Sequence, residues 1–124
     1  MRRLDRFLLG LYCVGAVIDS LSTHLLVGAG KVALRPGVYV FFVELNPFTE
    51  ALLGSPLFFL REAVMVAVLY ALAKAAEWII RHTEPKRWYV PSSPWPVLVG
   101  PVVIRWWAAL NNLSLVALLV GSLL

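Results

Sequence analysis

The sequence predicts an all-α integral membrane protein, a three-helix bundle with a short interfacial helix between spans one and two. The chain has 124 residues and is 60% hydrophobic, with a mean hydropathy of +0.81. That is far more apolar than a soluble domain. Three apolar stretches have the roughly 20 residues needed to cross a hydrocarbon core, at about 7–27, 57–80 and 102–124. We expect one transmembrane domain covering residues 1–124.

The first span follows a basic N-terminus and ends at Gly28 and Gly30, residues that stop helices. It is longer than the apolar region of a signal peptide and carries an acid and an imidazole, so we expect it to be retained. One stripe of this helix combines small and polar side chains, which membrane helices normally turn towards their neighbours. The stripe consists of Gly15, Ala16, Asp19, Ser22 and Thr23. Hydroxyls such as that of Ser22 also bond to carbonyls one turn earlier.

The connection to the second span contains two turn signals. The first, at 35–37, precedes an apolar run at 38–43 that is too short to span as a helix. We expect this run at the outer interface or against the bundle, where protein covers its backbone. Asn46 and Pro47 then predict the start of the short interfacial helix, with Asn46 as N-cap. The second turn signal, at 54–56, ends that helix.

The second span contains a regular series of alanines and two charges near its outer start. Small residues four apart form a groove into which another helix packs closely. The alanines are Ala63, Ala67, Ala71 and Ala75. Arg61 points about 200° away from Ala63, so this span needs protein on two sides unless Arg61 snorkels to the headgroups. If protein does lie on both sides of the second span, the chain is expected to form a homo-oligomer or part of a larger membrane complex.

The third span is expected to open at Pro101, after a proline-rich turn at 84–96. Arg105 lies beside Trp106 and Trp107 in this assignment, close to the membrane edge, and we expect it to snorkel. Asn112 shares a helix stripe with two alanines and is expected to face the bundle as a hydrogen-bonding contact between helices.

Ionisable residues inside the spans predict a buried polar cluster. Asp19 lies roughly 13 Å from the outer end of span one, and Arg61 roughly 8 Å from the outer start of span two. A bridge between them is therefore geometrically reasonable. Each charge costs ~2.5–3.5 kcal/mol at a helix centre if it is left alone. The cluster is expected to comprise Asp19, Thr23, Glu44, Asn46, Arg61, Glu62 and Asn112.

The distribution of basic residues predicts the orientation. Lys and Arg concentrate before span one and after span two, whereas the connection between these spans holds only Lys31 and Arg35. The positive-inside rule then places the N-terminus and the second loop in the cytoplasm and the C-terminus outside the cell membrane. All five tryptophans fall at the cytoplasmic interface under this topology. The net charge of +4 is spread over helix ends, which excludes a nucleic-acid partner and leaves the lipid bilayer.

No enzymatic motif is present: there is no phosphate loop, no H-E-x-x-H and no nucleophile elbow. We expect no cofactor. A metal site would need Asp19, His24, Glu44 and Glu62, which lack characteristic spacing, so none is expected either. The sequence favours a non-catalytic packing, accessory or assembly protein. Two alternatives stay open: a subunit of an oligomeric transporter or channel for a small solute or ion, and a metal-dependent membrane enzyme.

Two short motifs, D-x-x-x-T late in span one and E-x-N-P before span two, resemble a small prokaryotic three-span membrane family catalogued as a domain of unknown function. That family also has a basic residue early in span two and an asparagine in span three. The matching residues are Asp19, Thr23, Glu44, Asn46, Pro47, Arg61 and Asn112. The link between the two motifs is longer here, and Phe41 replaces a family glycine. The resemblance implies that these polar residues belong together, and it implies no activity.

Overall fold

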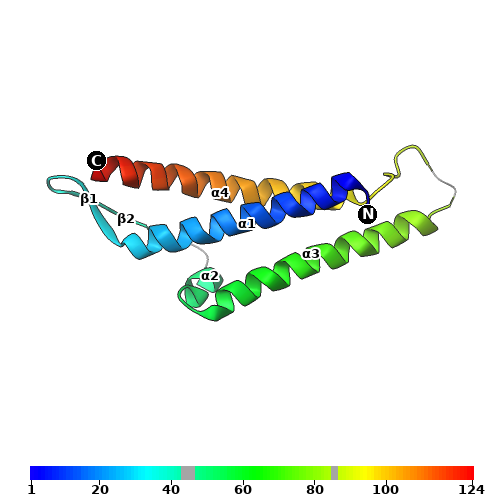
Figure 1. The fold of residues 1–124 in the computed structure, drawn as a ribbon, viewed down its shortest axis with the longest axis horizontal. Coiled ribbons are helices and arrows are strands. Elements are labelled where there is room, and N and C mark those ends of the chain that lie inside the picture. Colours follow the sequence, from blue (N-terminus) through cyan, green and yellow to red (C-terminus); the bar gives the residue numbers. More distant parts are fainter. Residues whose placement is uncertain (43–46, 85–86) are drawn as a thin grey trace.

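Three long helices dominate the computed structural model, which describes residues 1–42, 47–84 and 87–124. They are α1 (Arg3–Ala29), α3 (Pro56–His82) and α4 (Trp95–Leu123), and each is long and apolar enough to cross a membrane. Helices α1 and α4 run in the same direction, with α3 antiparallel to both (Figure 1). The predicted three-helix membrane fold is therefore confirmed.

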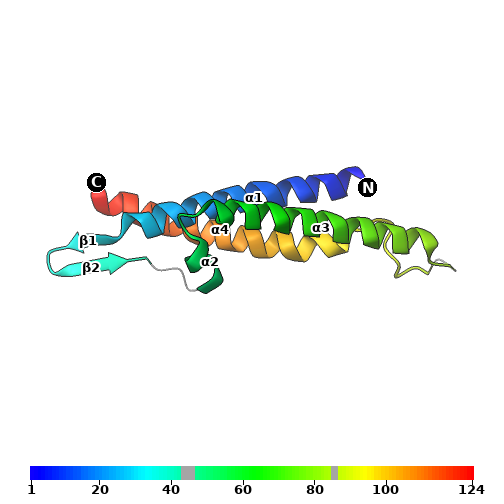
Figure 2. The same cartoon turned by 90° about the horizontal axis from the view of Figure 1, so that it is seen from below.

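A small β-hairpin follows α1 and lies at the end of the molecule opposite the N-terminus (Figure 2). Its strands are β1 (Lys31–Arg35) and β2 (Val38–Phe41), paired antiparallel with Val32 opposite Val40. The turn between them falls at the predicted signal, where Gly37 has a φ of 79° that glycine adopts without strain. The sequence did not predict strands here. Pairing satisfies backbone groups that an isolated extended segment would leave open near lipid.

The short helix α2 (Pro47–Leu52) lies where the sequence predicts it, and a tight turn separates it from α3. Gly54 has a φ of 78° in this turn. The hydroxyl of Ser55 accepts a hydrogen bond from the backbone N–H of Leu57 at 3.2 Å, and Pro56 begins the helix. This is a favourable helix start, because the proline needs no donor there. The predicted N-cap of α2, Asn46, lies outside the described residues.

The predicted start of the third span is wrong, since α4 begins at Trp95 and contains Pro101. Pro96 fits the first turn, where its missing N–H has no partner to lose. Pro101 removes one interior hydrogen bond, a loss that membrane helices tolerate. Trp106 and Trp107 consequently lie roughly 17 Å from the start of α4, further into the helix than the sequence predicted. The indole N–H of Trp106 donates to the carbonyl of Leu11 at 2.9 Å.

Helices α1 and α4 approach closely because small residues line their contact. A Cβ built on Gly15 would lie 3.1 Å from both Cγ of Arg105 and Nε1 of Trp106. Ala16 on α1 and Ala109 on α4 are also buried. Small side chains of this kind let membrane helices gain van der Waals contact and interhelical hydrogen bonds. The predicted small and polar stripe of α1 therefore faces α4.

Helix α3 packs against this pair through a different face from the one predicted. In the half nearer the N-terminus, Leu69 and Ala73 join a buried core with Tyr12, Leu98 and Val102. The four alanines expected to pack are instead all exposed within the chain: Ala63, Ala67, Ala71 and Ala75. The buried residues of α3, Phe58, Leu69 and Ala73, make the inward face, and the stripe of four alanines points outward.

Candidate functional site

Arg105 of α4 is the centre of a charge network that contacts all three long helices. We define the charge network as Asp19, Arg61, Glu62 and Arg105. One guanidinium nitrogen of Arg105 lies 2.9 Å from Asp19 of α1, and the other lies 2.9 Å from Glu62 of α3. The second nitrogen also donates to the hydroxyl of Tyr12 at 3.0 Å. The side chains of Asp19, Glu62 and Arg105 are 18%, 12% and 14% exposed, so these are largely buried contacts.

Arg61 closes the network on its other side. Its guanidinium pairs with Glu62 at 2.7 Å and donates to the hydroxyl of Thr49 in α2 at 2.6 Å. The ring of Phe58 lies 4.9 Å beneath it. Two arginines and two carboxylates give the network no net charge. The predicted bridge from Asp19 to Arg61 is replaced by a bridge from Asp19 to Arg105, and Arg61 pairs with its own neighbour in sequence.

Asn112, seven residues after Arg105 on α4, makes a second polar contact between α4 and α1. Its amide nitrogen donates to Asp19 at 2.9 Å and to the hydroxyl of Thr23 at 3.0 Å. Arg105 and Asn112 are seven residues apart, and so are their α1 partners Tyr12 and Asp19. Seven residues rise roughly 10 Å on both helices. Because α1 and α4 run in the same direction, the equal spacing lets Arg105 meet Tyr12 and, two turns further along both helices, lets Asn112 meet Asp19.

The structure thus brings together five of the residues that the sequence predicted as a cluster, namely Asp19, Thr23, Arg61, Glu62 and Asn112. The other two, Glu44 and Asn46, lie outside the described residues. Sequence reasoning missed Tyr12, Thr49 and the role of Arg105. Placing the start of the third span at 102 left Arg105 at the membrane edge. The signal for an inward position was its spacing: Arg105 lies seven residues before Asn112 and therefore on the same helix stripe.

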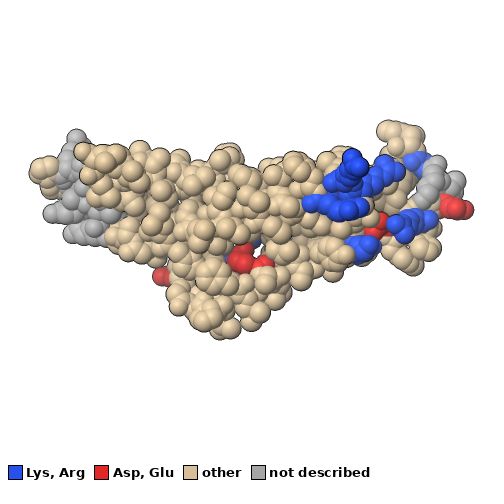
Figure 3. All heavy atoms as spheres, viewed as in Figure 1, with Lys and Arg blue, Asp and Glu red and all other residues tan. Residues whose placement is uncertain are grey.

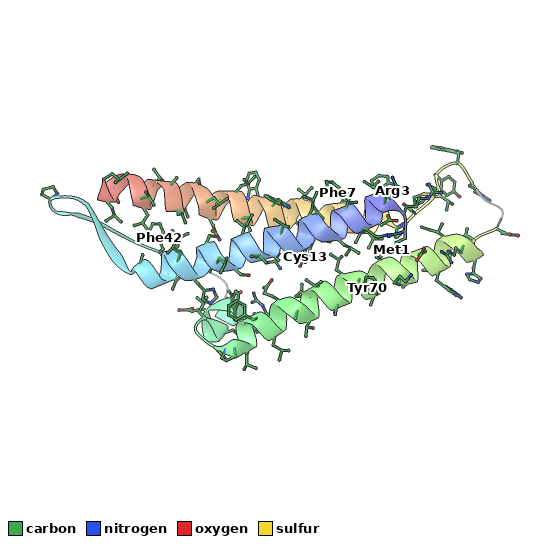
Figure 4. The ribbon with its side chains drawn as sticks, viewed as in Figure 1. Met1, Arg3, Phe7, Cys13, Phe42 and Tyr70 are labelled. Carbon is green, nitrogen blue, oxygen red and sulfur yellow. The ribbon has the colours of Figure 1, made fainter. Side chains whose placement is uncertain are left out.

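A cavity of about 890 Å³ lies beside the charge network and is bounded by all three long helices, α2 and Phe42. Figure 3 shows a hollow in this part of the surface with acidic atoms at its mouth, and Figure 4 shows where Phe42 lies near α1. Thr23, Asn111 and Asn112 add polar groups to its lining, whereas Met65, Trp107 and Leu115 give it apolar walls. Its size falls in the range of small-molecule sites.

His24 is held by contacts that do not involve the network. Its Nδ1 lies 2.7 Å from the carbonyl oxygen of Ser20. Its ring meets Phe58 edge-on with centroids 4.5 Å apart and stacks on Phe59 at 5.6 Å. Within residues 1–42, 47–84 and 87–124, no group of three His, Cys, Asp or Glu side chains is arranged to hold a metal ion.

A second polar cluster lies at the end of the molecule where most of the basic side chains gather (Figure 3). The N-terminal amino group pairs with Glu77 of α3 at 2.6 Å, and Lys74 and Arg81 pair with the same carboxylate at 3.0 and 2.9 Å. Figure 4 shows Met1 at this end of α1, facing α3. Asp5 is fully buried and accepts hydrogen bonds from the backbone of Arg2 and from Ser93. These bonds tie the start of α1 to the segment before α4.

Together, the three apolar helices and the paired charges inside them are those of a small multi-pass integral membrane protein. The chain matches no protein-family model, and no curated protein or solved structure is significantly similar to it.

Proposed function

We propose that this is a non-catalytic membrane protein whose charge network fixes the register of its three spans and so builds a defined surface for assembly. One observation carries the proposal: the guanidinium of Arg105 contacts carboxylates from both other long helices. Sliding any one helix by a turn would separate these groups and leave charges unpaired. Isolated charges cost ~2.5–3.5 kcal/mol at the centre of a membrane helix, which penalises every other register.

Replacing Arg105 tests this proposal. In Arg105→Leu, Asp19 and Glu62 lose their shared cation, and we expect a loss of about 3–5 kcal/mol because buried charges lose their partner. The double variant Asp19→Leu/Arg105→Leu leaves Glu62 with Arg61, so it should be less destabilised than the single variant. Unfolding by increasing SDS in mild detergent micelles measures both values.

The matched control is Arg87→Leu, which removes an exposed arginine outside the spans and should change stability little. Unchanged stability of Arg105→Leu would contradict the proposal. Solute or ion flux above background in reconstituted vesicles would instead favour the alternative, a subunit of an oligomeric transporter or channel.

We further propose a cell-membrane location with the N-terminus in the cytoplasm and the C-terminus outside. Among the side chains that the structure describes, the exposed basic residues support this orientation, because they gather at the end that holds the N-terminus and the α3–α4 connection. They are Arg2, Arg3, Arg6, Lys74, Arg81 and Arg87. The resemblance to the small prokaryotic three-span family stays a prediction.

The partner of the assembly surface is proposed to be a second copy of this chain, through the alanine stripe of α3. The four alanines leave a shallow face that no described part of the chain covers. Oligomeric state in mild detergent tests this. Ala67→Leu should weaken a dimer that packs on this face, and a monomeric wild-type protein would overturn the idea.

A further inference from the structure

The cavity beside the charge network has the chemistry of a binding site for an uncharged molecule. It is lined by both acids and both bases of the network, and each of these side chains already has a partner within the protein. Their formal charges cancel. A free anion or cation would therefore gain little attraction here and would have to compete with pairs that are already formed.

Asn111 supplies polar capacity that the protein itself leaves unused. Its side chain lines the cavity, and its backbone carbonyl accepts a hydrogen bond from the hydroxyl of Ser114 at 2.6 Å. Among the described residues, no group bonds to the Asn111 amide. Asn111 lies roughly 24 Å from the start of α4 and roughly 18 Å from its end, deep within the span. An amide without a partner is costly at that depth, so a polar group entering the cavity would be stabilised there.

The remaining lining requires that this molecule also have an apolar part. Met65, Leu115 and the aromatic rings of Phe42, Phe58 and Trp107 all face the same space. Trp107 is 78% exposed within the chain, so most of its ring is available for contact beside the polar groups of the cavity. Sites of this size combine such walls with a few polar groups that orient the ligand.

We propose that the cavity binds an uncharged amphiphile from the bilayer, with a hydroxyl- or amide-bearing head at Asn111 and an apolar tail along Trp107. This inference goes beyond the proposed role in helix register and does not depend on it, since Asn111 is not part of the charge network.

Photo-crosslinking to the purified full-length protein in vesicles tests the inference. The probe is a monoacylglycerol with a photoactivatable group in its chain, and adducts are located by peptide mass spectrometry. We expect saturable adducts on the residues that line the cavity. Asn111→Leu should reduce the apparent affinity by about tenfold, which is the effect of losing roughly 1.4 kcal/mol. Asn111 is exposed within the chain and makes no side-chain bond among the described residues, so this variant should keep its unfolding midpoint.

A second variant fills the cavity. Ala108 lines it, so Ala108→Phe should abolish saturable labelling, whereas Ala117→Phe, on an exposed position of the same helix outside the cavity, should not. A fatty acid probe of the same chain length carries a negative head and should label at background level. Labelling that Asn111→Leu leaves unchanged, or a carboxylate probe that binds as well as the glycerol one, would overturn the inference.

Discussion

At the scale of single residues, Arg105 depends on a glycine for its position. Gly15 is buried on α1, and the side chains of Arg105 and Trp106 occupy the space where a Cβ would lie. The close approach brings the guanidinium within reach of Asp19 and lets Trp106 bond to the backbone of α1. One missing side chain thus permits both a salt bridge and a hydrogen bond between α1 and α4.

Replacing this glycine with a large residue should separate α1 from α4. We expect Gly15→Leu to destabilise the protein by about 1–3 kcal/mol, as overpacking does, and to shift the fluorescence of Trp106. Gly10→Leu is the matched control, because a Cβ at Gly10 meets nothing within 4 Å. Unfolding midpoints in detergent measure the difference, and equal midpoints for the two variants would contradict this account.

At the scale of elements, α3 is attached to the α1–α4 pair by three kinds of contact along its length. Glu62 pairs with Arg105 in the half nearer α2, Leu69 and Ala73 pack in the apolar core, and Glu77 pairs with the N-terminus near the last turn. The ion pairs of Glu62 and Glu77 thus lie on either side of the apolar contact along α3. Because lipid competes with apolar contacts but not with ion pairs, we expect the two carboxylates to fix where α3 lies against its neighbours.

Glu77 should therefore hold the last turns of α3 against the start of α1. In Glu77→Gln the amino terminus, Lys74 and Arg81 lose their common carboxylate, and we expect faster amide hydrogen exchange across 74–82. The effect should be smaller than that of Arg105→Leu, because this end is closer to water. Glu84→Gln, an exposed acid two residues beyond α3, provides the control. Unchanged exchange in Glu77→Gln would show that the core alone fixes this end.

At the scale of the whole molecule, charge is distributed unevenly between two ends. One end holds the N-terminus, the end of α3 and the start of α4, together with the exposed basic side chains that the structure describes; the other holds the hairpin, α2 and the C-terminus (Figures 1 and 3). Basic residues at one end set orientation in the membrane.

This asymmetry predicts which end a reagent outside the cell can reach. In a Cys13→Ser background, Leu124→Cys should react with a membrane-impermeant thiol reagent on intact cells. Glu84→Cys should react only after the membrane is permeabilised. Both positions are exposed in the structure, so burial does not account for the difference. The reverse pattern of labelling would place the basic end outside.

The sequence by itself determined the class of protein, the number of spans, the turns at 35–37 and 54–56 and the inward stripe of α1. These features follow from local composition and periodicity, so they can be predicted without knowing how distant segments pack. The start of α4 was predicted at Pro101 but lies at Trp95, because proline is favourable in a first turn and is also tolerated inside a membrane helix. The two β-strands depend on pairing with each other, which no single segment reveals.

Only the tertiary structure decided which charges meet. Depth along each span predicted Arg61 as the partner of Asp19, whereas Arg105 was expected to snorkel; the structure pairs Asp19 with Arg105 instead. Because the third span was predicted to start several residues too late, Arg105 was expected near the membrane edge. The parallel packing of α1 and α4, which is close at Gly15, brings the guanidinium of Arg105 within 3 Å of the Asp19 carboxylate. Ion pairs in a membrane depend on such angstrom-scale alignment between segments far apart in sequence, whereas spans depend on composition alone.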